Sequence, residues 1–392
     1  MKIVSGMRPT GKLHLGHYLG VIKNWLELQE KHNCYFFIAD WHALTNKYKE
    51  TKELKNNIKE LMIDWLSTGI DPKKSTLFIQ SGVKEHAELA LLFGMFTPKS
   101  WLELNPSYKD LKFNLYFQYM RDFLLGKQIK INEDLLRDIF YKAFYHKKDI
   151  DFKFLIEELK SNNVPKKIAE EVVKNLSEGD IGKDIDTFGF FGYPILMAAD
   201  ILIYNAEGVP VGEDQLPHVE ITREIARRFN NLYTEVFVEP ESILTETPKL
   251  VGIDGRKMSK SYNNAIYLSD DEETVNKKAL SMKTDPQRIR KTDPGRPEVC
   301  PVFSYHQIFT DKETVEKIDK QCRNAEIGCV DCKKIIAENL NKFLTPIREK
   351  RKEIEENIEK YEKYFIEGTE EARVEASKTM KEVRKAMNLY QI

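Results

Sequence analysis

Short apolar runs alternate with helix-period runs along the first third of the chain. Residues 2–6, 34–45 (CYFFIADWHALT) and 75–81 (STLFIQS) have the apolar character of buried strands. The apolar spacing from Leu15 to Leu26 predicts a helix between the first two runs, and residues 52–67 predict an amphipathic helix before the third. Strands alternating with helices predict an α/β fold with a parallel sheet, which binds ligands at the carboxyl ends of its strands.

The pattern changes twice further along the chain. Lys-, Glu- and aromatic-rich helical segments occupy residues 111–181, and one of these predicted helices starts at Pro165 and stops at Gly179. The α/β pattern returns at 188–205 and 209–215, and a charged, helix-forming sequence follows residue 270. We therefore expect a split sheet domain (1–110 and 182–270), a helical insertion (111–181) and a helical C-terminal domain (271–392).

Composition indicates a soluble globular protein, with 41% hydrophobic and 31% charged residues. The net charge of -1 gives no whole-chain argument for nucleic-acid binding, so any such contact needs a local basic patch. The longest uncharged apolar stretch, residues 187–199, is too short to cross a bilayer, so we expect no membrane partner. The first residues, MKIVSGMRPTG, lack the apolar core of a secretory signal, which predicts a cytoplasmic protein.

A first candidate site follows the first predicted strand. There, His14 and His17 flank Gly16 at the start of a predicted helix, in the sequence HLGH. Helix N-terminal and imidazole N–H groups suit a triphosphate, and a glycine lets a base lie against the backbone. The alternative is a pair of surface histidines that cap a helix.

A second candidate site is the sequence DGRKMSKS at residues 254–261. Lys257 and Lys260 lie three residues apart in a Gly- and Ser-containing loop, which suits a mobile clamp for a leaving pyrophosphate. A solvated basic loop is the alternative. Together, in this order and on these elements, HLGH and KMSKS resemble the paired signature of class I aminoacyl-tRNA synthetases.

Six longer stretches resemble the tryptophanyl-tRNA synthetases within that class. They are SGMRPTGKLHLGHYLG, CYFFIADWHALT, NPSYKDL, GYPILMAADILIYN, VPVGEDQLPHVEITREIARRFN and DGRKMSKSYNN. The resemblance implies a Rossmann-like parallel-sheet catalytic domain, a C-terminal all-helical anticodon-binding domain and a homodimer. It also implies that L-tryptophan reacts with ATP to give tryptophanyl-adenylate and pyrophosphate, before transfer of tryptophan to the 3′ end of tRNA(Trp).

The resemblance also implies roles for individual residues at the ATP site. The expected ATP-binding residues are Arg8, Pro9, Thr10, Gly16, His17, Gly212, Glu213, Asp214, Leu250, Lys257, Met258, Ser259, Lys260 and Ser261, with Mg²⁺ accompanying ATP. The expected catalytic residues are His14, His17, Lys109, Lys257 and Lys260. Members of the family often have glutamine where this chain has Arg8.

For tryptophan, the resemblance implies that Asp200 binds the indole nitrogen. The rest of the expected pocket consists of His42, Tyr193, Met197, Val209, Val211 and Gln215. An indole N–H is only a donor, so a buried pocket needs one fixed acceptor, and phenylalanine would leave that acceptor unpaired at a cost of about 1–3 kcal/mol. Without the preceding GYPILMAAD, an aspartate that caps a helix or forms a salt bridge would be the favoured interpretation of Asp200.

Four of the five cysteines fall in one stretch, with the spacing C-x21-C-x6-C-x2-C from Cys300 through Cys322 and Cys329 to Cys332. Four thiolates can hold a [4Fe-4S] cluster or a tetrahedral zinc ion, and the alternative is four unrelated cysteines. A subset of tryptophanyl-tRNA synthetases resembles this pattern and has a [4Fe-4S] cluster beside the anticodon site. We therefore expect the cluster, with zinc as the alternative.

A basic run precedes Cys300 and suits an RNA backbone, although a solvated face is equally compatible with it. Its members are Lys277, Lys278, Lys283, Arg288, Arg290, Lys291 and Arg296.

Three other functions fit part of the pattern. Tyrosyl-tRNA synthetases share the fold and both signatures, but lack the GEDQ context around an aspartate directed at an indole. Small nucleotidylyltransferases carry HxGH without KMSKS or a large helical domain. A non-catalytic RNA-binding iron-sulfur protein would have lost signature residues, whereas His14, Lys257 and Asp200 are all present here.

Overall fold

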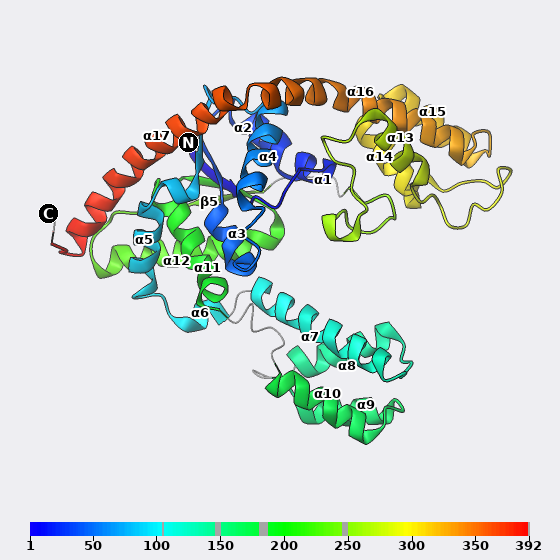
Figure 1. The fold of residues 1–392 in the computed structure, drawn as a ribbon, viewed down its shortest axis with the longest axis horizontal. Helices are drawn as coiled ribbons and strands as arrows, with labels where there is room; N and C mark the ends of the chain where they lie inside the picture. The colour runs from blue at the N-terminus through cyan, green and yellow to red at the C-terminus, as the bar shows by residue number, and fades with distance from the viewer. Residues whose placement is uncertain (104–105, 146–149, 180–186, 245–249, 391–392) are drawn as a thin grey trace.

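A five-stranded parallel sheet forms the centre of the computed structural model, which describes residues 1–103, 106–145, 150–179, 187–244 and 250–390 (Figure 1). The strand order is β3-β2-β1-β4-β5. The strands are β1 (Lys2–Met7), β2 (Asn33–Ile38), β3 (Ser75–Ile79), β4 (Gly208–Val211) and β5 (Glu241–Leu244). Because β1 pairs with both β2 and β4, the strand order reverses at β1, and this is the place where α/β sheets bind ligands. The predicted α/β class is confirmed.

Successive strand residues point to opposite sides of the sheet and build two cores. Ile3 and Phe36 belong to one core, whereas their neighbours Val4 and Phe37 belong to the other. Both sides are apolar because helices cover both sides, so the strands appear in the sequence as continuous apolar runs.

Helices from both ends of the chain cover the first side. Its centre is Trp25, which stacks on Phe36 with ring centroids 4.2 Å apart and meets Trp65 edge-on at 4.9 Å. The elements on this side are α1 (Leu15–His17), a π-helical segment η1 (Tyr18–Ile22), α2 (Lys23–Leu28), α4 (Leu54–Ser67), α13 (Glu272–Ser281), α14 (Pro301–Phe309) and α16 (Cys329–Glu356).

Four longer helices contribute to the second side. They are α5 (Glu85–Gly94), α11 (Phe188–Leu202), α12 (Leu216–Leu232) and α17 (Ile358–Ala386). Helix α17 lies against the edge strand β3, where a Cβ on Gly368 would come within 2.1 Å of the Leu77 carbonyl oxygen. The Ile79 N–H donates to Thr369 Oγ1 at 3.3 Å. The last helix of the predicted helical C-terminal region therefore protects the open edge of the sheet.

The remaining helical elements are short connectors at the edges of the sheet and in the C-terminal region. They are α3 (Asp40–Lys47), α6 (Lys99–Glu103), α15 (Lys312–Arg323) and the 3₁₀ turns η2 (Gln80–Gly82), η3 (Glu213–Gln215), η4 (Lys260–Tyr262) and η5 (Pro297–Val299). No helix within the described ranges is long and apolar enough to span a membrane.

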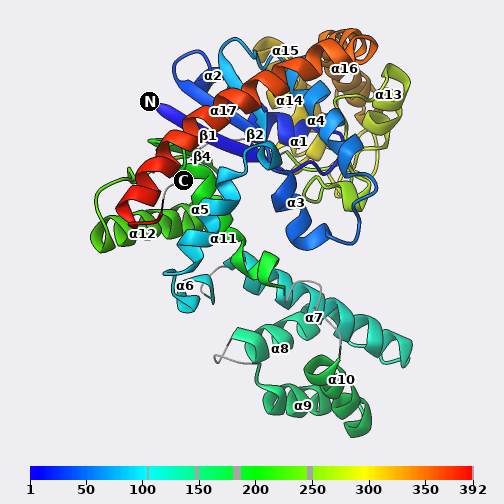
Figure 2. The same cartoon turned by 60° about the vertical axis from the view of Figure 1, so that its left-hand side comes forward.

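The insertion forms a helical module that projects from the body below α6 and α11 (Figures 1 and 2). Its helices are α7 (Pro106–Gly126), α8 (Glu133–Tyr145), α9 (Phe152–Ser161) and α10 (Lys166–Glu178). They enclose an aromatic core of their own, in which Phe113 packs against Phe140 at 5.2 Å between ring centroids. The predicted helix from Pro165 to Gly179 is confirmed as α10.

The predicted strand at 34–45 is only half correct. Strand β2 ends at Ile38, and the remaining residues form α3. Asp40 Oδ1 accepts from the Trp41 N–H, and Gln80 Oε1 accepts from the N–H groups of Trp41 and His42 at 3.1 and 3.3 Å. These side chains bind the free N–H groups of the first helical turn, a contact that an apolar pattern cannot reveal.

A buried ion cluster joins the C-terminal region to the HLGH turn. Arg351 of α16 pairs with Asp64 and Glu60 of α4, and Asp64 Oδ2 accepts from the Leu13 N–H at 2.7 Å. Asp64 is fully buried and Arg351 is 5% exposed. The backbone that leads into His14 is therefore fixed to a helix more than 300 residues later in the chain.

Candidate active site

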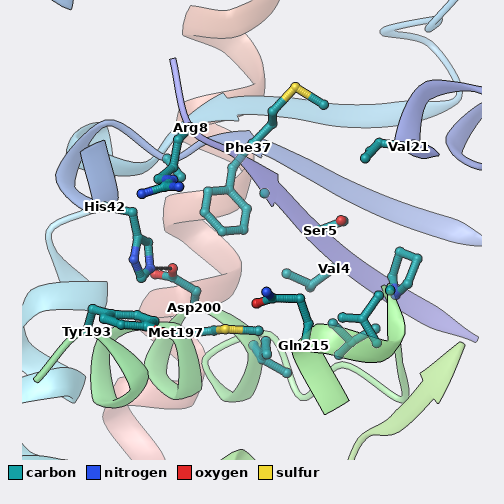
Figure 3. Close-up of a pocket in the computed structure, with 18 of the residues that line it drawn as sticks. Val4, Ser5, Arg8, Val21, Phe37, His42, Tyr193, Met197, Asp200 and Gln215 are labelled. Carbon is teal, nitrogen blue, oxygen red and sulfur yellow. Dashed lines mark hydrogen bonds and ion pairs between the residues drawn. The ribbon is translucent and has the colours of Figure 1, made fainter. Parts of the chain in front are cut away.

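A cavity of about 580 Å³ opens beside the carboxyl ends of β1 and β4 (Figure 3). Tyr193, Met197 and Asp200 reach it from one face of α11, because residues four and seven positions apart share a helix face. The structure brings all seven residues of the predicted tryptophan pocket to line this cavity: His42, Tyr193, Met197, Asp200, Val209, Val211 and Gln215. Arg8 and Gly212, predicted for ATP, also line it.

Asp200 is the acidic group at the inner wall of the cavity. It is 1% exposed, and its Oδ2 lies 2.8 Å from His42 Nε2. His86 Nδ1 lies 2.5 Å from Oδ1, and Gln80 Nε2 donates to both oxygens at 2.8 Å. Burial alone would raise the pKa of Asp200, but the hydrogen bonds from His42 and His86 lower it below its usual range. Asp200 is therefore an ionised acceptor at neutral pH.

Gln80 and His86 were not identified from the sequence. Gln80 directly follows β3, and His86 lies in the first turn of α5. Both are fully buried. A polar residue at the carboxyl end of a predicted parallel strand was a usable signal for Gln80, whereas His86 had no comparable signal.

The HLGH turn brings its two imidazoles into contact. The ring centroids of His14 and His17 lie 3.7 Å apart, and a Cβ on Gly16 would come within 3.0 Å of the His14 ring. Burial lowers the pKa of His14 to about 4 with a further contribution from Lys260, and it lowers the pKa of His17 to about 3, helped by His14 and Lys260. Both rings are therefore neutral at pH 7 and can donate N–H groups without carrying charge.

Lys260 connects the KMSKS loop to the turn after β1. Its Nζ donates to the carbonyl oxygen of Thr10 at 2.9 Å and to Thr10 Oγ1 at 3.3 Å. A second hollow of about 270 Å³, lined by Pro9, Thr10 and Lys47 among others, adjoins this contact. Burial lowers the pKa of Lys260 to about 8; nearby Asp64 opposes this shift, and Lys47 adds to it.

Asn264 holds the loop in shape and was missed by the sequence reasoning. Its Oδ1 accepts from the Ser259 N–H at 2.8 Å, and its Nδ2 donates to Asp254 Oδ1 at 2.8 Å and to the Lys257 carbonyl oxygen at 3.1 Å. Asn264 is 1% exposed. The residue lies in the stretch DGRKMSKSYNN, but nothing in that pattern distinguishes a buried asparagine from an exposed one.

The other residues predicted for ATP are distributed around these elements. Lys257 is exposed and Met258 is buried beneath it, while Ser259 is half-buried. Glu213 and Asp214 are exposed after β4, and Leu250 is buried in the first core. Lys109 is exposed on α7, two residues before Leu111, which lines the cavity. The side chain of Ser261 lies outside the described part of the structure.

The four cysteines come from three segments. Cys300 precedes α14, Cys322 lies in α15, and Cys329 and Cys332 lie in the first turn of α16. Burial and then the other three thiols raise the pKa of Cys332 to about 12, so the four sulfurs influence one another. Within the described residues, however, no three His, Cys, Asp or Glu side chains are gathered as ligands around one point.

Most basic side chains of the run before Cys300 form ion pairs or hydrogen bonds within the protein. Lys277, Lys278 and Arg296 pair with Glu273, Asp270 and Asp285. Arg288 is 8% exposed and donates to the Ile327 carbonyl oxygen at 2.8 Å. The exposed remainder of the predicted basic patch is Lys283, Arg290 and Lys291.

Comparison with known proteins identifies the family. The model of the family described as tRNA synthetases class I (W and Y) matches residues 1–133 and 141–345. A tryptophan–tRNA ligase of Aquifex aeolicus is 59% identical over 99% of this chain and 100% of its own length, and one of Thermotoga maritima is 46% identical over 99% of both. The chain belongs to the tryptophan–tRNA ligase family of class I tRNA synthetases.

A solved structure of this family has the same fold. It is the tryptophanyl-tRNA synthetase of Campylobacter jejuni in complex with ADP and tryptophan, which is 30% identical and matches with a TM-score of 0.75. The match covers 99% of this chain and 100% of that one. The family relationship therefore extends over the sheet, the insertion and the C-terminal helices.

The lowered pKa of Lys260 predicts how the affinity for ATP depends on pH. Lys260 is one of the residues predicted to hold the ATP phosphates. Below about pH 8 the free protein carries the Lys260 ammonium, and bound phosphates would favour that form, so we expect the full affinity there. The affinity should fall as pH rises above 8, because binding must then restore the proton. Titration calorimetry with ATP between pH 6.5 and 9.5 measures this decline.

The matched control is Lys260→Arg, whose guanidinium keeps its charge over this range. We expect its ATP affinity to be flat between pH 7 and 9, whereas Lys257→Arg should keep the wild-type decline. The same decline in Lys260→Arg and in the wild type would show that another group titrates.

Proposed function

We propose that this chain joins L-tryptophan to tRNA(Trp) in two steps. Tryptophan first reacts with ATP to give tryptophanyl-adenylate and pyrophosphate, and the amino acid then passes to the 3′ end of the tRNA. The observation that carries the proposal is the ionised carboxylate of Asp200 at the inner wall of an otherwise largely apolar cavity. The names of the relatives support the same conclusion.

The cavity chemistry suits an indole. The ring would lie among Met197, Val209 and Val211, and its only polar group, the N–H, would donate to Asp200. Hydrogen bonds to a charged acceptor are about twice as strong as neutral ones, so this single contact contributes much of the selectivity. Tyr193, His42 and Gln215 would complete the pocket around the amino group and the ring.

The activation step needs alignment and positive charge and no protein nucleophile. The tryptophan carboxylate would attack the α-phosphate of ATP in line and displace pyrophosphate. Lys257 and Lys260 would stabilise the negative charge that develops on the phosphates, joined by Lys109, while His14 and His17 would donate neutral N–H groups. Mg²⁺ would accompany the ATP phosphates. A ribose hydroxyl of the tRNA would then attack the adenylate carbonyl and displace AMP.

The remaining residues of the predicted ATP site would surround the nucleotide. Arg8, Pro9, Thr10 and Gly16 follow β1, while Gly212, Glu213 and Asp214 follow β4 and would contact the ribose. Leu250 would lie against the adenine. The helical region 271–392 would bind the anticodon arm, and exposed Lys283, Arg290 and Lys291 support an RNA contact there. Since tRNA charging serves cytoplasmic protein synthesis, the proposal also implies a cytoplasmic enzyme.

The test is exchange of labelled pyrophosphate into ATP, measured with tryptophan and tyrosine side by side. We expect exchange with tryptophan alone. Asp200→Asn keeps the shape of the side chain but removes its charge, and it should lower kcat/KM for tryptophan at least about tenfold, which corresponds to ~1.4 kcal/mol. Exchange with tyrosine alone, or an unchanged kcat/KM in Asp200→Asn, would contradict the proposed pocket.

We also propose that the four cysteines hold a [4Fe-4S] cluster. Their mutual effect on the pKa of Cys332 supports their convergence, and four thiolates are the ligand set of such a cluster. A Cβ on Gly295 would come within 2.4 Å of Cys322 Sγ, so the backbone there lies directly against this thiol. In this proposal Cys300, Cys322, Cys329 and Cys332 each bind one iron.

The cluster predicts that anaerobically purified protein contains iron and acid-labile sulfide in equal amounts and absorbs near 400 nm. Cys329→Ser should lose both, whereas Cys34→Ala should keep them, because Cys34 is buried in β2 away from the other four. Zinc without sulfide in the wild type would replace the cluster with a zinc site, and absence of both metals would refute metal binding.

A homodimer is the third part of the proposal. Apolar side chains are exposed at the end of α5, where Leu91 is 60% exposed and Met95, directly after the helix, is 68% exposed. At the end of α12, Leu232 is 53% exposed. The two helices lie side by side, since the rings of Phe93 in α5 and Phe229 in α12 are 6.4 Å apart. A second copy of the chain would cover this apolar face.

If the chain forms this homodimer, analytical ultracentrifugation should give a mass of twice that of the 45.8 kDa chain. The double variant Leu91→Glu, Met95→Glu places charges in the proposed interface and should sediment as a monomer. Val374→Glu changes a residue of α17 that is 59% exposed, and it should leave the dimer intact. A monomeric wild type, or a dimer that survives the double variant, would contradict this interface.

A further inference from the structure

We propose that Gln80, His86 and Tyr204 are positioning residues that hold Asp200 as an oriented acceptor and thereby set the selectivity for an indole N–H. The inference rests on the proposed function and goes beyond it, because none of these three residues lines the cavity. They lie behind Asp200, and all three are fully buried.

Gln80 has only one possible amide orientation in this site. Its Oε1 accepts from the backbone N–H groups of Trp41 and His42 at the start of α3. Its Nε2 must therefore face Asp200, where it donates to both carboxylate oxygens at 2.8 Å. Gln80 thus fixes the plane of the carboxylate relative to α3, the helix that carries His42.

His86 and Tyr204 form a chain behind Asp200. His86 Nδ1 lies 2.5 Å from Asp200 Oδ1, and His86 Nε2 lies 2.7 Å from the Tyr204 hydroxyl. A carboxylate only accepts, so His86 Nδ1 carries the proton of this contact and donates it to Asp200, and a hydroxyl that donates to Nε2 favours the same tautomer. Tyr204 therefore selects the tautomer in which His86 is a donor to the carboxylate.

This arrangement makes the two carboxylate oxygens unequal. Gln80 donates to both oxygens, and Oδ1 also accepts from His86, so Oδ1 has both of its donors buried behind the cavity. Oδ2 faces His42, which lines the cavity and is 12% exposed. The oxygen available to a ligand is therefore Oδ2, and an incoming indole N–H would share it with His42 or replace that contact.

Loss of the Tyr204 hydroxyl should weaken recognition of the indole N–H by Asp200 without changing the shape of the pocket. His86 Nε2 would then be buried without a partner, and the ring could turn or change tautomer so that Asp200 loses its fixed donor. The readout is the ratio of kcat/KM for tryptophan to kcat/KM for β-(3-benzothienyl)alanine, in which sulfur replaces the indole N–H. Both values come from the pyrophosphate-exchange assay.

We expect Tyr204→Phe to lower kcat/KM for tryptophan about tenfold while the value for the benzothienyl analogue changes little, so that the ratio falls. The matched control is Tyr35→Phe, which removes a hydroxyl from the ring stacked on Tyr204 at 4.9 Å and leaves His86 untouched. Its ratio should remain that of the wild type. An unchanged ratio in Tyr204→Phe, or an equal fall with both substrates, would overturn the inference.

A second pair of variants decides the matter if Tyr204→Phe does not fold. His86→Asn can place its amide nitrogen near the position of Nδ1 and should retain most of the preference for tryptophan, whereas His86→Ala should lose it. Equal ratios in these two variants would overturn the inference. A wild type with no preference for tryptophan over the analogue would instead refute the proposed indole contact of Asp200 itself.

Discussion

The parallel pairing of β1 with both β2 and β4 is the constraint on which the site depends. Because all five strands are parallel, their carboxyl ends meet at one edge of the sheet, and each of the first four strands delivers part of the site there. β1 leads to the HLGH turn, β2 to His42, β3 to Gln80 and β4 to Gly212. Side chains from distant parts of the chain can therefore surround one cavity without any long structureless loop.

The Asp64–Arg351 pair adds a second constraint, which fixes the C-terminal region to this edge. Removing one partner of a buried pair typically costs about 3–5 kcal/mol, because the other charge is then buried alone. Asp64 also binds the Leu13 N–H, so the position of α16 and the geometry of the HLGH turn depend on the same carboxylate. With α17 covering β3, the last two helices are part of the structural frame of the sheet.

The local sequence pattern predicted the helices and strands well. The errors arose where residues that are distant in the sequence determine the local structure or its contacts. The run at 34–45 is mostly apolar, and its change from strand to helix depends on contacts of Asp40 and of Gln80, which directly follows another strand. Gln80 and His86 lie 120 and 114 residues from Asp200, and no sequence period connects them. The number of free cations in the basic run before Cys300 was overestimated for the same reason. The carboxylates that pair with Lys278 and Arg296 become visible only in the fold.

The charge states of the site follow from burial together with the partners that each group has. Burial disfavours the charged form of His14, Lys260 and Asp200. Asp200 nevertheless has three side-chain donors and remains ionised, whereas the adjacent histidines have a nearby cation and become neutral. Neutral imidazoles can donate to phosphate oxygens without repelling the lysines of the KMSKS loop. The lysines of that loop thus carry positive charge, and negative charge is kept on Asp200 at the wall of the cavity, where the indole N–H of the proposed substrate would donate to it.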